Sequence, residues 1–163
     1  MLLLTLFISC SSSLRFPGSL SYLGRQATPY LPSPSTLYQI PTKGQISSPF
    51  GMRIHPVHNT KKMHNGLDIA APKGTPIYPI RPGIISFSGS QRGYGKIVII
   101  DHGGGISSRY AHCSRLLVQK GDSVEHNDMI ATVGKSGTAT GYHLHLEIRI
   151  DNKPVDPKPI LFD

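Results

Sequence analysis

Residues 141–150 (GYHLHLEIRI) restrict the fold of this chain more than any other stretch. From His143 onward, polar and apolar residues alternate, and this period of two is typical of a half-buried β-strand. In such a strand His143 and His145 leave by the same face, with their Cβ atoms about 7 Å apart. Two neighbouring imidazoles can bind a metal ion or transfer protons. The segment therefore predicts a sheet that carries a polar site on one face.

The other apolar runs of the chain also have the features of strands. Long amphipathic helical patterns are missing, and 17 glycines and 14 prolines supply turns between the runs. A length of 163 residues suits one domain with short extensions. We therefore expect an all-β fold rich in turns. The candidate strands are residues 45–50, 77–80, 83–88, 96–101, 106–112 and 129–133.

The chain is basic, with 17 Lys and Arg residues against 9 Asp and Glu residues and a formal net charge of +8. The basic residues are spread along the sequence and form no run interleaved with aromatic residues, so we expect no nucleic-acid partner. A cationic surface suits an anionic polymer such as a cell wall or a membrane surface. The alternative is a soluble basic protein with no such partner.

The N-terminal segment has the features of an export signal. Residues 1–8 (MLLLTLFI) are apolar, but they are too few to cross a bilayer and no Lys or Arg precedes them. Residues 7–10 (FISC) resemble a bacterial lipobox, in which cleavage before Cys10 leaves its thiol to be lipidated. The alternative is a plain cleaved signal or an unstructured start. With Cys10 in this segment no disulfide framework remains, and Cys113 is expected to be a small buried residue or a bystander thiol.

Residues 11–41 differ in composition from the chain that follows. They combine several prolines with many Ser, Thr and Leu and contain no acidic residue, and such a segment buries little and favours extended conformations. We expect residues 1–10 to be a signal or lipobox-like segment, residues 11–41 to be a disordered linker, and residues 42–163 to be the folded domain.

A second histidine motif precedes most of the predicted strands. His64 and Asp68 stand four apart, and zinc accepts N, O or S ligands in a tetrahedral shell. Catalytic zinc sites keep three protein ligands and a water molecule. The His-x-x-x-Asp spacing alone occurs often by chance, and Asp68 could instead cap a turn. Combined with His143 and His145, it predicts a metal site that joins two distant parts of the fold.

The other polar candidates have less specific patterns. His102 is expected to begin a glycine turn outside the site. Arg53 and Asn65 are candidate substrate contacts. The histidines expected to be solvated, with the second close enough to line a cleft, are His55, His58 and His126.

Several segments carry a family resemblance when they are taken together and in order. They are residues 64–69 (HNGLDI), 100–103 (IDHG), 110–112 (YAH), 120–124 (KGDSV) and 134–147 (GKSGTATGYHLHLE). From about Gln45 to Asp156 the chain resembles the lysostaphin/LytM-type zinc metallopeptidases, with Tyr142 where proline is common in that family. The resemblance implies a single all-β domain, mainly of antiparallel sheet, with a groove over which loops carry the ligands.

The resemblance also assigns roles to particular side chains. It implies one zinc ion held by His64, Asp68 and His145. It places His112 and His143 as non-ligand histidines that transfer protons and stabilise the developing oxyanion. Strand alternation allows His143 and His145 to reach one site while serving different roles.

The implied function is hydrolysis of peptide bonds in peptidoglycan, in a stem peptide or a cross-link, during cell-wall remodelling. Peptidoglycan is then the partner, and the location is the exported bacterial cell envelope, periplasmic or membrane-anchored through Cys10. One alternative is a non-catalytic wall-binding activator of a separate peptidoglycan amidase, although such relatives lack one or more ligands. Another is a lipid-tethered structural protein that binds the wall through its basic surface. The bond cleaved and the oligomeric state do not follow from the sequence.

Overall fold

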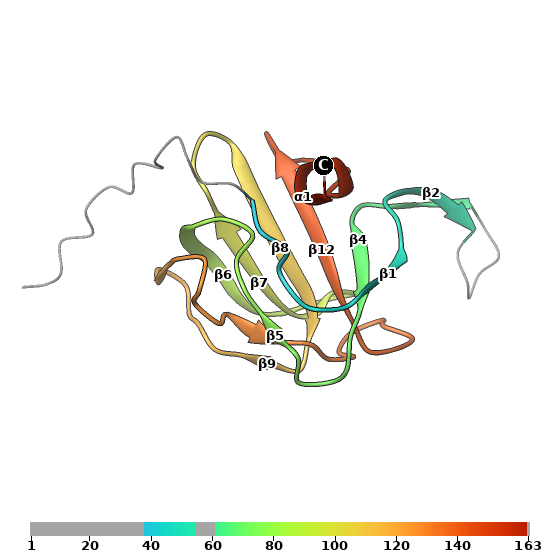
Figure 1. Cartoon of the computed structure of the whole chain (residues 1–163), viewed down its shortest axis with the longest axis horizontal. Helices are drawn as coiled ribbons and strands as arrows, with labels where there is room; N and C mark the ends of the chain where they lie inside the picture. The colour runs from blue at the N-terminus through green and yellow to red at the C-terminus, as the bar shows by residue number, and fades with distance from the viewer. Residues whose placement is uncertain (1–37, 55–60, 163) are drawn as a thin grey trace, which may run out of the picture. The chain divides into compact units, whose positions relative to one another are not determined.

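The computed structural model describes residues 38–54 and 61–162, and these residues form β-sheets with one short helix (Figure 1). All strand pairings between them are antiparallel. The predicted fold class, mainly antiparallel all-β, is therefore confirmed. The elements are β1 (Gln45–Ser48), β2 (Gly51–Ile54), β3 (Lys61–His64), β4 (Leu67–Ala70), β5 (Pro76–Ile77), β6 (Gly83–Gln91), β7 (Gly95–Asp101), β8 (Ile106–Cys113), β9 (Arg115–Leu116), β10 (Ser123–Val124), β11 (Ala131–Thr132), β12 (His143–Ile150), β13 (Lys153–Val155) and α1 (Lys158–Phe162).

The largest sheet has the strand order β1-β4-β12-β8-β7-β6-β10, with β13 paired to the end of β12. Strand β12 therefore lies between β4 and β8 (Figure 1). A small sheet of order β5-β11-β9 and the β2-β3 hairpin complete the structure. The turn from β12 to β13 consists of Asp151 and Asn152, which both have positive φ. This conformation matches the right-handed twist of the two strands that the turn joins.

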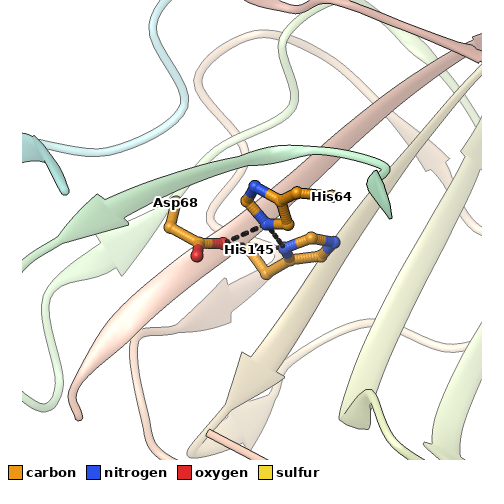
Figure 2. A group of neighbouring side chains, drawn as sticks. All are labelled: His64, Asp68 and His145. Atoms are coloured by element: carbon orange, nitrogen blue, oxygen red, sulfur yellow. Dashed lines mark hydrogen bonds and ion pairs between the residues drawn. The ribbon is translucent and has the colours of Figure 1, made fainter. Parts of the chain in front are cut away.

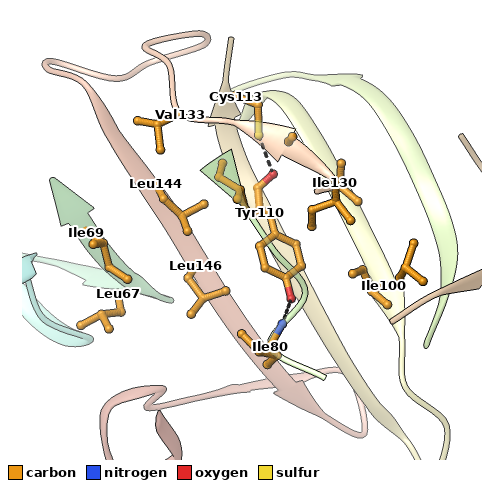
Figure 3. Close-up of a cluster of buried hydrophobic side chains, with 14 of the residues drawn as sticks. Leu67, Ile69, Ile80, Ile100, Tyr110, Cys113, Ile130, Val133, Leu144 and Leu146 are labelled. Atoms are coloured by element: carbon orange, nitrogen blue, oxygen red, sulfur yellow. Dashed lines mark hydrogen bonds between the residues drawn. The ribbon is translucent and has the colours of Figure 1, made fainter. Parts of the chain in front are cut away.

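The core lies on one face of the large sheet. Leu144, Leu146 and Ile148 of β12 are fully buried and join one cluster with Tyr110 of β8 (Figure 3). Residues of the small sheet, such as Ile77, belong to the same cluster. Because side chains alternate along a strand, burial of this apolar set directs His143, His145 and Glu147 to the other face of β12.

A buried polar group lies on the core side of the large sheet, around residues 100–103 (IDHG). His102 Nδ1 lies 2.8 Å from the Pro82 carbonyl, and His102 Nε2 lies 2.7 Å from Ser108 Oγ. The hydroxyls of Ser108 and Tyr110 are 2.8 Å apart, and the Ile80 amide donates to the Tyr110 hydroxyl at 2.8 Å. Asp101 Oδ1 accepts from the Gly103 amide and shapes the glycine turn. His102 thus has a structural place, away from the metal-binding motif.

The sequence predicted the long strands, and β1 within residues 45–50, but it missed several of the short strands. Strands β6, β7, β8 and β12 lie where they were expected, whereas the expected strands at 77–80 and 129–133 shrink to β5 and β11. Strands of two to four residues, such as β3, β4 and β10, are too short to display a period. Cys113 is fully buried, as predicted.

The N-terminal predictions, Cys10 included, fall on residues outside the described part of the chain, except for residues 38–41 at the end of the predicted linker. The described part begins at Tyr38, which packs against the core, and the backbone N–H of Gln39 donates to the Ile80 carbonyl. The domain boundary at Thr42 stays a prediction. Within residues 38–54 and 61–162, no helix has the length and hydropathy needed to cross a membrane.

Candidate metal and catalytic site

Three ligand-type side chains converge where β3, β4 and β12 meet (Figure 2). Asp68 of β4 lies directly opposite His145 of β12 in the sheet register, and His64 ends β3 just before β4 begins. A Cβ at Gly66, in the turn between β3 and β4, would collide with the Leu146 carbonyl and the His145 ring. Glycine therefore permits the close approach that brings His64 to the other two.

The spacing of these three side chains fits a metal ion. Asp68 Oδ1 is 3.1 Å from His64 Nε2 and 2.7 Å from His145 Nδ1, and the two nitrogens are 3.1 Å apart. Ligands of a tetrahedral zinc ion lie about 3.3 Å from one another. All three side chains are buried, and two imidazoles with one carboxylate form a donor set that zinc prefers. The residues present therefore fit the zinc ion that the resemblance implies.

The charge of Asp68 is matched to this role. Burial by itself would raise the pKa of the Asp68 carboxyl, but the contacts with His145 and His64 and their charges hold it below the usual value. The carboxylate is therefore in the anionic form that a metal ligand needs.

Each ligand histidine uses its second nitrogen to fix its orientation. His64 Nδ1 donates to the Pro49 carbonyl at 2.7 Å, which leaves Nε2 as the nitrogen that faces Asp68. His145 directs Nδ1 toward Asp68 and Nε2 toward Glu147 Oε1, 3.4 Å away. With a metal ion bound, these outer contacts would keep a proton on each outer nitrogen and leave the inward nitrogen for the ion.

His112 and His143 form a second pair beside the ligands, with ring centroids 4.9 Å apart. His112 Nδ1 donates to the Ser136 carbonyl at 2.8 Å, and His143 Nδ1 donates to the Gly141 carbonyl at 3.0 Å. The Nε2 atoms are thus left to exchange protons, and that of His143 lies 3.8 Å from Asp68 Oδ1. Burial lowers the pKa of His112 to about 4, so its imidazole is neutral at physiological pH.

The backbone of His112 adopts an unusual conformation, with φ at 62°. A non-glycine residue in the left-handed region costs free energy and is found at functional sites more than elsewhere. The His112 amide donates to the Tyr94 carbonyl, and its carbonyl accepts from the Ser136 amide. These bonds hold the strained residue at the end of β8, from which its side chain reaches the cleft.

The structure adds Glu147 and Tyr94 to the residues expected from the sequence. Glu147 has no exposed surface, and its Oε1 accepts from the Tyr94 hydroxyl at 2.6 Å. Burial alone would raise the pKa of the Glu147 carboxyl, but contacts with His145, Tyr94 and Arg149 lower it to about 2. The strand period that grouped His143 with His145 also includes Glu147, and this signal could have identified it.

All five predicted site residues line one cleft of about 350 Å³. Asn65, a candidate substrate contact, lies on its wall together with Lys62. His55, His58 and the Arg53 side chain lie outside the described residues. The full lining is Lys62, Met63, His64, Asn65, Asp68, Gly93, Tyr94, His112, Thr138, Ala139, Thr140, His143, His145 and Glu147.

Comparison with known proteins finds peptidases among the relatives of this chain. The DD-carboxypeptidase/endopeptidase Mpg of Neisseria meningitidis is 45% identical over 113 residues, which are 69% of this chain and 26% of that protein. The peptidoglycan DD-endopeptidase ShyA of Vibrio cholerae is 38% identical over 120 residues, which are 73% of this chain and 28% of that protein. The chain thus spans about a quarter of the length of these relatives.

Solved structures agree with the sequence relatives. The crystal structure of a zinc-containing peptidase from Vibrio cholerae superposes with a TM-score of 0.70 at 35% identity, covering 74% of this chain and 39% of that one. The expected zinc cofactor accords with this relative and with the ligand set. The model of peptidase family M23 matches residues 62–157, which contain all five predicted site residues. The match covers more than half of the sequence, and the chain belongs to peptidase family M23.

Proposed function

We propose that the protein is a zinc-dependent endopeptidase that hydrolyses peptide bonds of peptidoglycan, in a stem peptide or a cross-link. The observation that carries the proposal is the convergence of three ligand side chains and two further histidines in one cleft. The names of the relatives, DD-carboxypeptidase/endopeptidase and peptidoglycan DD-endopeptidase, support the substrate and the reaction. We assign His64, Asp68 and His145 as metal ligands.

In the proposed mechanism the ligands hold the metal ion, and the second histidine pair transfers protons. A bound zinc ion lowers the pKa of water and polarises the scissile carbonyl. His112 and His143 each donate Nδ1–H to a backbone carbonyl, so the Nε2 atom of each ring is the one that can accept a proton from the attacking water. The protonated imidazole can then donate to the leaving amine or to the negative charge that develops on the carbonyl oxygen.

The N-terminal residues complete the proposal. A signal or lipobox-like segment at 1–10 and a linker at 11–41 would place the domain in the cell envelope, either in the periplasm or tethered through Cys10. The net charge of +8 suits an anionic wall. Mass spectrometry of the mature N-terminus would identify a lipidated Cys10, and an intact Met1 on the envelope-associated protein would contradict export by cleavage.

The direct test is release of peptides from defined cross-linked muropeptides, followed by mass spectrometry of the products. We expect hydrolysis that depends on zinc and is lost in His64→Ala. A non-catalytic activator of an amidase would release nothing by itself and would keep its stimulating effect in the same variant. The presence of all three side chains proposed as ligands in one cluster favours the enzyme over the activator.

A further inference from the structure

The polar face of β12 continues beyond the ligand His145. Two residues further on, Glu147 leaves by the same face and lies directly opposite Arg109 of β8. Glu147 is fully buried, and a buried carboxylate is costly unless charges and hydrogen bonds compensate it. The groups that contact the Glu147 carboxylate therefore indicate its role.

The two oxygens of Glu147 face different surroundings. Oε1 accepts from the Tyr94 hydroxyl at 2.6 Å and lies 3.4 Å from His145 Nε2. Oε2 accepts from Arg149 Nε at 2.8 Å and lies 3.8 Å from Arg109 Nε. The arginine side compensates the charge of the carboxylate, while Oε1 is directed at the metal ligand.

The outer ring nitrogen of His145 has a different kind of partner from those of the other site histidines. The outer nitrogens of His64, His112 and His143 donate to backbone carbonyls, whereas that of His145 faces a carboxylate. A carboxylate at the outer nitrogen of a ligand histidine fixes its ring and tautomer and makes its inner nitrogen a stronger metal ligand.

We propose that Glu147 is a positioning residue of the metal site, which holds His145 with Nδ1 toward the zinc ion and is itself held by Tyr94, Arg109 and Arg149. The inference rests on the proposed function, because it takes zinc as the metal. The competing explanation is that Glu147 only stabilises the sheet through its ion pairs with the two arginines.

Zinc affinity separates the two explanations. Apoprotein of the full chain is titrated with Zn²⁺ in competition with a chromophoric chelator, and the thermal unfolding of each apoprotein is recorded in parallel. We expect Glu147→Ala to weaken zinc binding about 10- to 100-fold. Glu147→Gln keeps an oxygen acceptor for His145 but loses the charge, so we expect a smaller loss. If the alanine variant does not fold, the nearly isosteric glutamine variant decides.

Ser108→Ala is the matched control, because Ser108 is a buried polar residue on the neighbouring strand and belongs to the His102 group. We expect it to lower the unfolding temperature while zinc affinity stays within about twofold of wild type. Both Glu147 variants binding zinc as tightly as wild type, with only the unfolding temperature reduced, would overturn the inference. A wild-type protein that binds no zinc, or a His145→Ala variant that binds it normally, would instead overturn the proposed function.

Discussion

Two buried groups in the described part of the chain, one around His102 and one around the proposed metal ligands, satisfy their polar atoms in opposite ways. Around His102 the donors and acceptors form a closed series: a carbonyl, an imidazole, two hydroxyls and an amide. In the proposed metal site, His64, Asp68 and His145 direct nitrogen and oxygen atoms at one another within 2.7–3.1 Å. Proton donors satisfy the first group, and a cation suits the second.

Structural histidines and proposed ligand histidines differ in the partners of their ring nitrogens. Burial does not separate them, because His102, His64 and His145 are all buried. The partner of each ring nitrogen separates the two kinds of histidine. Both ring nitrogens of His102 have a partner inside the closed series, because Nδ1 donates to the Pro82 carbonyl and Nε2 lies 2.7 Å from the Ser108 hydroxyl. In each histidine proposed as a ligand, the outer nitrogen has a partner outside the ligand set and the inner nitrogen faces another proposed ligand.

The largest expected effect comes from removing the metal or a ligand. We expect chelation of zinc, or His64→Ala, to abolish peptide release from cross-linked muropeptides, because the nucleophile and the polarised carbonyl both depend on the ion. Zinc content by mass spectrometry and product analysis by chromatography measure the two effects. His102→Gln is the control and is expected to keep its zinc; if it lost zinc as His64→Ala does, the distinction between the two groups would fail.

A smaller effect is expected in the histidines that do not bind the metal. His143→Ala should keep stoichiometric zinc while the rate of hydrolysis falls about 10²- to 10⁴-fold, the usual contribution of a general acid or base. His112→Ala should do the same. Steady-state rates and zinc content of the same preparations provide the check. Unaltered rates in both variants would remove the second histidine pair from the mechanism.

The closed group should affect stability and leave the chemistry intact. Tyr110→Phe removes the hydroxyl that contacts Ser108 and the Ile80 amide, and it leaves buried partners unsatisfied. We expect the free energy of unfolding to fall by about 1–3 kcal/mol, with activity per folded molecule unchanged. Urea unfolding and activity assays at matched folded concentration measure both. A change in zinc affinity would show that the two groups are coupled.

The smallest effect concerns pH. Burial, reinforced by the charge of Arg81, lowers the pKa of His102 below its ordinary value of 6.5, although the Pro82 carbonyl and Asp101 oppose the shift. The unfolded chain therefore takes up a proton at a higher pH than the folded chain does. Stability that is present above pH 6.5 should be lost as the pH falls from there toward the folded pKa, by at most about 1.4 kcal/mol per pH unit.

His102→Gln isolates this contribution. The difference between wild type and variant in the free energy of unfolding, measured in urea across the acid range, should shrink as the pH falls below 6.5. A pH-independent difference would mean that His102 does not titrate differently in the two states.

Much of this molecule was predictable from local patterns. The period of two along β12 places His143 and His145 on one face and Leu144 and Leu146 in the core, because side chains of a strand alternate regardless of what surrounds it. The all-β class follows from the same reasoning applied to the other long strands. The spacing of His64 and Asp68 supplied the second half of the metal site, and the family resemblance joined the halves.

Only the tertiary structure decided how the parts meet. The antiparallel register sets Asp68 opposite His145, which is far away along the chain, and no local period encodes such a pairing. The same holds for Glu147: its position on the polar face was visible in the sequence, but its burial depends on Tyr94 and on arginines from two strands. The alternation of side chains along each strand thus determined which of them share a face, and long-range strand pairing determined which of them share a site.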